Sequence, residues 1–286
     1  MRLRDPKNDV IFKALLTRNP LLLADVIERV LDLPAPLSEV TVLNPSLEID
    51  RADDKASVLD VRCRLADGRL IGLEMQVDVR PVFVRRLLYY WARSYGGQLV
   101  AGRDYSALRP SISIAWLARN IFAGETMHTI AKLCDVHTHR LICEDVELHF
   151  MELSKLRPED LQRDRAAPWA RFFRFESEDD IEQLAKEFPI MSQAKVALGK
   201  LSEDERLAQI AEDQHRAWAS RLIEKQFARE EGHAEGKAIQ LRESILDMCE
   251  IGGIAVTETQ KASLAAMSLS ELEALRARIK SERRWE

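Results

Sequence analysis

The spacing of apolar residues changes along the chain and predicts helices in some segments and strands in others. Helical spacing predicts short amphipathic helices over 9–16 and 20–33. Strict alternation of apolar and polar residues predicts strands over 58–65, 69–78, 111–117 and 146–153. Helices, two strands, a helix and further strands in this order predict a mixed α/β domain.

The helix that follows the second strand has two chemically different sides. It runs from Val82 to about Tyr95, and Pro81 suits its first turn. The apolar residues at helical spacing are Val84, Leu87, Leu88, Trp91 and Tyr95. The other side carries Arg85, Arg86, Tyr89 and Arg93. We expect the apolar side to face the core and the arginine side to face outward.

The last third of the chain lacks strand alternation and is rich in Ala, Glu, Arg, Lys and Leu. We therefore expect a helical region over 199–286. Ser268 followed by Glu271 is the start signal of a final helix within it. The spacing of Gly232 and Gly236 either lets two helices approach closely or only weakens a solvated helix.

The first two strands form a hairpin around Ala66-Asp67-Gly68. A glycine at the end of a three-residue loop fits a turn closed by a glycine bulge, because that position needs a positive φ. This loop pairs Leu65 with Arg69 and places Asp60 directly opposite Glu74. A two-residue loop would move Asp60 to the apolar face, so the pattern selects the three-residue loop.

Side chains alternate along each strand, so this register gives the hairpin two faces. One face is entirely apolar and consists of Leu59, Val61, Cys63, Leu65, Ile71, Leu73, Met75 and Val77. The other consists of Asp60, Arg62, Arg64, Leu70, Gly72, Glu74, Gln76 and Asp78. We expect the apolar face to pack on a core and the polar face to be left for water or for chemistry.

The polar face carries a candidate metal site. Two carboxylates directly across a strand pair have Cβ atoms roughly 5 Å apart, and a hard cation such as Mg²⁺ between Asp60 and Glu74 would remove their repulsion. Gln76 projects from the same face. The alternative is an ordinary exposed strand face on which the two acids pair with Arg62 and Arg64, and the pattern alone favours it.

Composition and charge narrow the class of protein. With 286 residues and a hydrophobic fraction of 46%, the chain is able to bury a core. Its first ten residues are polar and charged, and no apolar run approaches the roughly 20 residues of a membrane span. We therefore expect a cytoplasmic protein without membrane contact, whose four cysteines are reduced.

The net charge of −5 means that any phosphate contact must come from a local patch. Between Asp60 and Arg103 the chain has eight arginines, no lysine and four acids, a local balance of +4. Beside the carboxylate pair, this excess favours DNA as the partner. The candidate DNA-binding residues are Arg62, Arg85, Arg86 and Arg93.

With these residues in view, the chain resembles a known family. Val58-Leu59-Asp60 followed by Glu74-Met75-Gln76 resembles the D…(D/E)-X-K signature of the PD-(D/E)XK nuclease superfamily. More closely, the chain resembles the recombination-promoting nuclease (transposase) family. The other segments that carry this resemblance are Asn8-Asp9-Val10-Ile11-Phe12-Lys13, Lys55, Arg86 with Tyr89-Tyr90, Tyr105 with Leu108, Ile112-Ser113-Ile114, Val146-Glu147-Leu148-His149, Glu152-Leu153 and Ala228-Arg229-Glu230-Glu231-Gly232 with Gly236.

The resemblance implies a restriction-endonuclease-like α/β core over 1–198, with a mixed central sheet flanked by helices, and Mg²⁺-dependent endonuclease cleavage of DNA in recombination or mobile-element biology. It implies that Asp60 and Glu74 are metal ligands. Gln76 takes the position of the motif lysine, and Asp9 is a candidate accessory acid from the first helix. Glutamine carries no positive charge, so this departure bears on the rate of cleavage.

Two functions are compatible with these features. The first is a metal-dependent DNA endonuclease with Asp60, Glu74 and Gln76 as catalytic residues, and the second is a weak or inactive nuclease fold that binds DNA or protein as an adaptor. Two carboxylates on one face favour the enzyme. A homodimer is expected, because double-strand cleavage needs two sites.

A zinc site is the less favoured use of a second group of residues. Cys134, His137, His139 and Cys143, with His149 further on, are ligand types that suit zinc. Their spacing matches no standard zinc finger, and several of them fit alternate positions of an ordinary strand. We therefore expect a structural role for this group.

Overall fold

The computed structural model describes residues 3–43, 61–100, 102 and 104–285. Asp60 lies outside these residues, and with it the expected pairing of Asp60 and Glu74. The chain divides into two compact units, Met1–Glu212 and Asp213–Glu286. The expected boundary between 198 and 199 stays a prediction.

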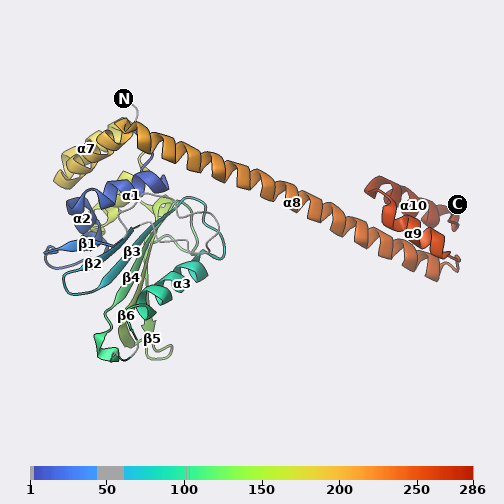
Figure 1. Ribbon diagram of the computed structural model, residues 1–286, viewed down its shortest axis with the longest axis horizontal. Helices are drawn as coiled ribbons and strands as arrows, with labels where there is room; N and C mark the ends of the chain where they lie inside the picture. The colour runs from blue at the N-terminus through green and yellow to red at the C-terminus, as the bar shows by residue number, and fades with distance from the viewer. Residues whose placement is uncertain (1–2, 44–60, 101, 103, 286) are drawn as a thin grey trace. The chain divides into compact units, whose positions relative to one another are not determined.

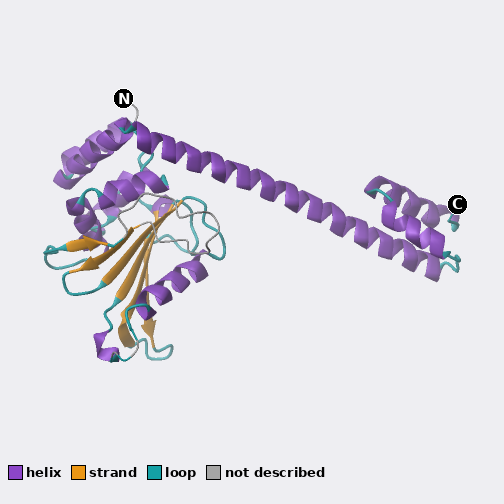
Figure 2. Cartoon of the chain, viewed as in Figure 1, coloured by secondary structure: helices purple, strands orange, loops and turns teal. Residues whose placement is uncertain are grey.

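A mixed sheet forms the centre of the first unit (Figures 1 and 2). Across the described residues the strand order is β1-β2-β3-β4-β6-β5, in which β3, β4 and β6 run parallel and the other neighbours antiparallel. The strands are β1 Val40–Val42, β2 Val61–Leu65, β3 Leu70–Gln76, β4 Ser111–Leu117, β5 His128–Cys134 and β6 Leu141–Glu152. The expected mixed α/β architecture is confirmed.

The hairpin of β2 and β3 has the predicted register. Val61 pairs with Leu73, and Leu65 N donates to Arg69 O at 2.9 Å. Gly68 adopts a φ of +91°, the left-handed value that the three-residue loop requires. The described part of the hairpin therefore confirms the turn and the register.

Helices cover both faces of this sheet. They are α1 Asp9–Thr17, α2 Pro20–Val30, α3 Phe83–Gly96, α4 Asp160–Arg163, α5 Ala167–Arg174, α6 Glu178–Glu187 and α7 Pro189–Glu203, with short 3₁₀ turns η1 Tyr105–Ala107 and η2 Leu153–Lys155. The main core lies between one face and α1, α2, α5, α6 and α7, and it contains the expected apolar residues of β3 and β4. A smaller core joins α3 to the opposite face.

The second face of the hairpin is less open than we expected. Leu70, Gly72 and Glu74, which we assigned to a face left for water or for chemistry, are buried. Phe83 and Leu87 of α3 form a core cluster with side chains of β4 and β6 on this side of the sheet. The expectation of an open polar face is therefore wrong for the part of β3 that these residues occupy.

The rotation of α3 also differs from our prediction. Leu87 is buried, as we expected, whereas Val84 and Leu88 of the same predicted side are 37% and 47% exposed. Phe83, which we had not assigned to this side, is buried. Two apolar stripes overlap on this helix, and the one that includes Phe83 packs on the sheet. Arg86 lies one helical turn from Phe83, at the border of the buried side.

The second unit is helical, as predicted. It contains most of α8 Glu205–Ile251, together with α9 Glu258–Ala266 and α10 Leu269–Glu282. Leu241, Ile245 and Cys249 of α8 form a core cluster with residues of α9 and α10. Ser268 and Glu271 form the expected capping box of α10. Over the described residues, no helix has the length and apolarity that a membrane span requires.

Candidate active site

Glu74 lies near the carboxyl end of β3. It sits beside Ala115 of the parallel strand β4, and Gln76 sits beside Leu117. Open α/β sheets bind their ligands at this end of parallel strands. Glu74 is only 4% exposed, so an acidic group is buried where such sheets bind ligands.

The two carboxylate oxygens of Glu74 have different surroundings. Oε1 accepts hydrogen bonds from Gln76 Nε2, at 2.7 Å, and from Arg86 Nη2. Oε2 is buried and has no hydrogen-bond partner among the residues that the structure describes. Burial raises the pKa of Glu74, and the guanidinium of Arg86 opposes this rise. A cation at Oε2 would satisfy the remaining oxygen.

Asp9 begins α1 and follows Asn8, whose side chain caps the helix by accepting from two backbone N–H groups. The negative charge of Asp9 lies close enough to Glu74 to raise the pKa of Glu74 further. The protein atoms around the Asp9 carboxyl exclude water from it and so raise the pKa of Asp9, whereas the positive charge of Arg86 lowers this pKa. The structure therefore brings two acids together around one arginine.

Arg86 enters this site from α3. Its guanidinium lies over the ring of Phe83, 5.3 Å from the ring centroid, and its Nη2 contacts Glu74. Its Nε is buried and has no acceptor within the described part of the chain. Our sequence analysis placed Arg86 on an outward DNA-binding side and missed this contact. A signal was present, because Phe83, Arg86 and Leu87 share one side of a helix at i, i+3 and i+4.

The remaining candidate residues lie around this group. Arg85 and Arg93 are exposed on α3, and the Arg93 guanidinium lies 5.9 Å from the centroid of the Tyr89 ring. Arg62 is opposite Gly72 in the β2–β3 ladder. Asp9, Glu74, Gln76 and Arg86 thus form the described centre of the site, with further arginines on neighbouring elements.

These residues fit a hard divalent cation. Asp9 and Glu74 offer carboxylate oxygens, the ligand type that Mg²⁺ prefers, and one oxygen of Glu74 is buried without a partner among the described residues. Gln76 Nε2 donates to Glu74 Oε1 and to Met75 O, at 2.7 and 3.0 Å, so its amide is anchored beside the acid.

A buried ion pair borders the same end of the sheet and was not predicted. Glu152 pairs in register with Leu117, the neighbour of Gln76, and its Oε2 lies 2.5 Å from Lys155 Nζ. Glu152 Oε1 accepts from the backbone N–H groups of residues 121 and 122, at 2.6 and 3.1 Å. Glu152 therefore holds the segment that follows β4 through these two backbone hydrogen bonds.

A second polar network lies on β5 and β6. His128 Nε2 lies 2.8 Å from His149 Nδ1, and His149 Nε2 lies 3.0 Å from Glu147 Oε1. Lys132 contacts Glu147 at one end of this network, and Asp164 contacts His128 at the other end. Burial lowers the pKa of His149, while the hydrogen bond from His149 lowers the pKa of Glu147 to about 2. A neutral His149 donates from Nε2 to Glu147 Oε1 and accepts at Nδ1 from His128 Nε2.

The zinc candidates do not form a metal site. Cys134, His137 and His139 are exposed around the turn between β5 and β6, and Cys143 is half-buried. Within the described ranges, no group of three or more His, Cys, Asp or Glu side chains is arranged to hold a metal ion.

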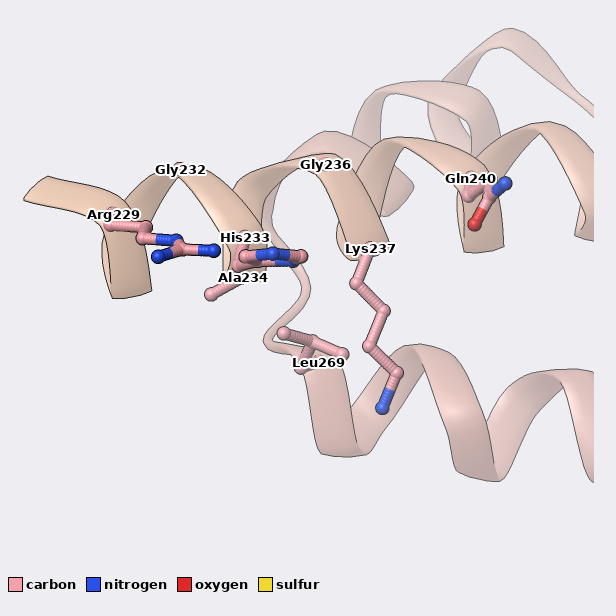
Figure 3. Close-up of a pocket in the computed structure, with 8 residues that line it drawn as sticks. All are labelled: Arg229, Gly232, His233, Ala234, Gly236, Lys237, Gln240 and Leu269. Atoms are coloured by element: carbon pink, nitrogen blue, oxygen red, sulfur yellow. The ribbon is translucent and has the colours of Figure 1, made fainter. Parts of the chain in front are cut away.

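A hollow of about 910 Å³ lies in the second unit, between α8 and the start of α10 (Figure 3). Gly232 and Gly236 line it, and a Cβ atom on either glycine would meet no atom within 4 Å. The close helix approach that their spacing suggested is therefore absent from the described structure. Lys237 at this hollow is paired with Glu273, at 2.6 Å.

A mixed sheet flanked by helices, with acids, an amide and an arginine at the carboxyl end of its parallel strands, defines an α/β protein of the nuclease type. The sequence pattern of the PD-(D/E)XK nuclease family transposases matches residues 6–224, more than two thirds of the chain, and the protein belongs to this family. The resemblance seen in the sequence is confirmed. No curated protein and no solved structure matches the chain.

Proposed function

We propose that the protein is a Mg²⁺-dependent DNA endonuclease that hydrolyses phosphodiester bonds in recombination or in the movement of mobile elements. The observation that carries this proposal is Glu74, a buried acid at the carboxyl end of a parallel strand, with one oxygen that lacks a partner among the described residues. Its membership of a nuclease family gives this acid a reason to be buried.

In this proposal Asp60 and Glu74 hold the metal ion, and Asp9 is an accessory acid. When bound, such an ion would supply the charge that lowers the pKa of a water molecule and stabilises the phosphate. Gln76 orients the attacking water. Its side chain is half-buried and already anchored to Glu74 and to the backbone, which suits a positioning role.

The arginines give the site its affinity for DNA. Arg62, Arg85, Arg86 and Arg93 come from β2 and α3, the elements that flank Glu74, and arginine binds phosphate through two parallel N–H groups. We further propose a cytoplasmic homodimer, in which two such sites cut the two strands of a duplex.

The second candidate function is an adaptor that keeps the nuclease fold without cleavage. The observation in its favour is Gln76, because glutamine cannot provide the positive charge of the motif lysine. Glu74 Oε2 favours the enzyme, because burying a carboxylate oxygen without a donor among the described residues is costly and an adaptor has no use for it.

Plasmid cleavage with Mg²⁺, Ca²⁺ or EDTA separates these functions. We expect the wild type to cut with Mg²⁺ and not with EDTA, and we expect Asp60→Ala and Glu74→Gln to lose cleavage by a factor of at least about 100, since each removes a metal ligand. Glu144→Gln, at an exposed acid of β6, is the matched control and should cut normally. A wild type that does not cut, or an Asp60→Ala variant that cuts equally well, would reject the enzyme.

A further inference from the structure

Two buried polar atoms of opposite character lie in the candidate site. Glu74 Oε2 is an acceptor without a donor, and Arg86 Nε is a donor without an acceptor, among the residues described. The two side chains already contact each other through Arg86 Nη2 and Glu74 Oε1. Each of the two remaining atoms is therefore open to a further partner, an electron-pair acceptor at Glu74 Oε2 and a hydrogen-bond acceptor at Arg86 Nε.

A cation and an anionic oxygen, bound side by side, would satisfy both atoms. A metal ion alone would complete Glu74 and leave Arg86 Nε buried without an acceptor, which is costly. A phosphate oxygen alone would lie beside the carboxylates of Glu74 and Asp9, whose negative charges would repel it. Together the two ligands neutralise each other.

We propose that Arg86 bridges Glu74 and the DNA, donating through Nη2 to the carboxylate and through Nε to an oxygen of the phosphate that lies on the metal ion. This role rests on the proposed function and adds a positioning residue to it. Arginine suits it, because its planar guanidinium presents several N–H groups in fixed directions, whereas lysine has one nitrogen. Arg86 then supplies the fixed positive charge that Gln76 cannot.

Arg85 differs from Arg86 although the two are neighbours in the sequence. Arg85 is exposed on α3, whereas Arg86 is partly buried against Phe83 and contacts Glu74. An exposed arginine attracts the DNA backbone whether or not a metal ion is bound. Arg86 Nε gains its acceptor only when the phosphate is seated on the metal ion, so its contribution should depend on the metal.

The test is binding of a fluorescent DNA duplex by the full chain, measured by anisotropy with Ca²⁺ or with EDTA. Ca²⁺ is the probe because it can occupy carboxylate sites. We expect Arg86→Met to weaken binding about tenfold or more with Ca²⁺, as for a lost hydrogen bond to a charged group, and less than about threefold with EDTA. Arg86→Lys should show the same pattern, and a thermal melt of each variant checks its folding. Arg85→Met, the matched control, should weaken binding by the same factor in both conditions.

The outcomes separate this role from the proposed function. Equal losses for Arg86→Met with Ca²⁺ and with EDTA would overturn the bridging role and leave the nuclease standing. Full binding by Arg86→Lys with Ca²⁺ would also overturn it, since charge alone would then suffice. If Arg86→Met does not fold, Arg86→Lys decides the matter. If Ca²⁺ does not strengthen DNA binding by the wild type, the metal site at Glu74 fails and the bridging role falls with it.

Discussion

Replacing Lys155 by methionine breaks the buried ion pair at the carboxyl end of the sheet. Lys155 Nζ donates to Glu152 Oε2, at 2.5 Å, and to Phe122 O, at 3.0 Å. The side chain of Glu152 is fully buried and that of Lys155 is 6% exposed, so water cannot replace the lost partner. The methionine side chain fills most of the space and leaves the Glu152 charge uncompensated.

The expected cost follows from this burial. Removing one partner of a buried ion pair costs about 3–5 kcal/mol of unfolding free energy. Two backbone N–H groups still donate to Glu152 Oε1, so we expect the lower part of this range, about 3 kcal/mol. Adding Glu152→Gln removes the stranded charge while the amide oxygen keeps these donors. The double variant should therefore be more stable than the sum of the two single effects predicts, by about 1–3 kcal/mol.

Urea unfolding of the full chain at pH 7, followed by tryptophan fluorescence, measures these differences. Lys195→Met is the control, because it breaks an exposed pair with Glu182 in the same unit and should cost far less. Additive effects of Lys155→Met and Glu152→Gln, or a loss for Lys155→Met no larger than the control, would refute the description of a coupled buried pair.

Three further predictions concern other parts of the molecule. The ring of Phe173 packs on four other aromatic rings in the main core. Replacing Phe173 by alanine should cost about 3–5 kcal/mol of unfolding free energy, and a loss below about 1 kcal/mol in urea unfolding would contradict the packing. Burial raises the pKa of Cys63 to about 12. A thiol reagent at pH 8 should therefore label the exposed Cys134 at once and Cys63 only after unfolding. Mass spectrometry of the labelled peptides measures this difference. Glu147 should titrate near its pKa of about 2 when its carboxyl group is followed by NMR. Because this pKa is depressed in the folded protein, Glu147 contributes to stability above about pH 4.5, and this contribution is lost as the pH falls toward 2. Titration of Glu147 near pH 4.5 would refute the prediction.

The register of the β2–β3 hairpin could be predicted from the sequence, whereas the packing of α3 over its second face could not. The register followed from alternation and from Gly68, because both act locally along two adjacent strands. The burial of Glu74 depends on α3, which packs over β3 from further along the chain. Leu70 and Gly72 on the nominally polar face were the local sign that something covers it.

Contacts between elements explain the other differences. Arg86 reaches Glu74 only in one rotational setting of α3, and the two overlapping apolar stripes of that helix leave the setting open until it packs. The strand β5 was not predicted because it is an edge strand with Lys132 and largely exposed residues, so it lacks the alternation of a half-buried strand. Buried pairs such as Glu152 with Lys155 carry no periodic signal at all.

We expect a divalent cation to bind at Glu74 Oε2. A crystal of the full chain soaked in Mn²⁺, which suits the same carboxylate ligands, tests it through an anomalous-difference map. We predict a peak beside Glu74 Oε2, at about the 2.1 Å of a hard-cation bond, and no such peak in a Glu74→Gln crystal. A map with no peak at Glu74, or with an equal peak in both crystals, would contradict the claim.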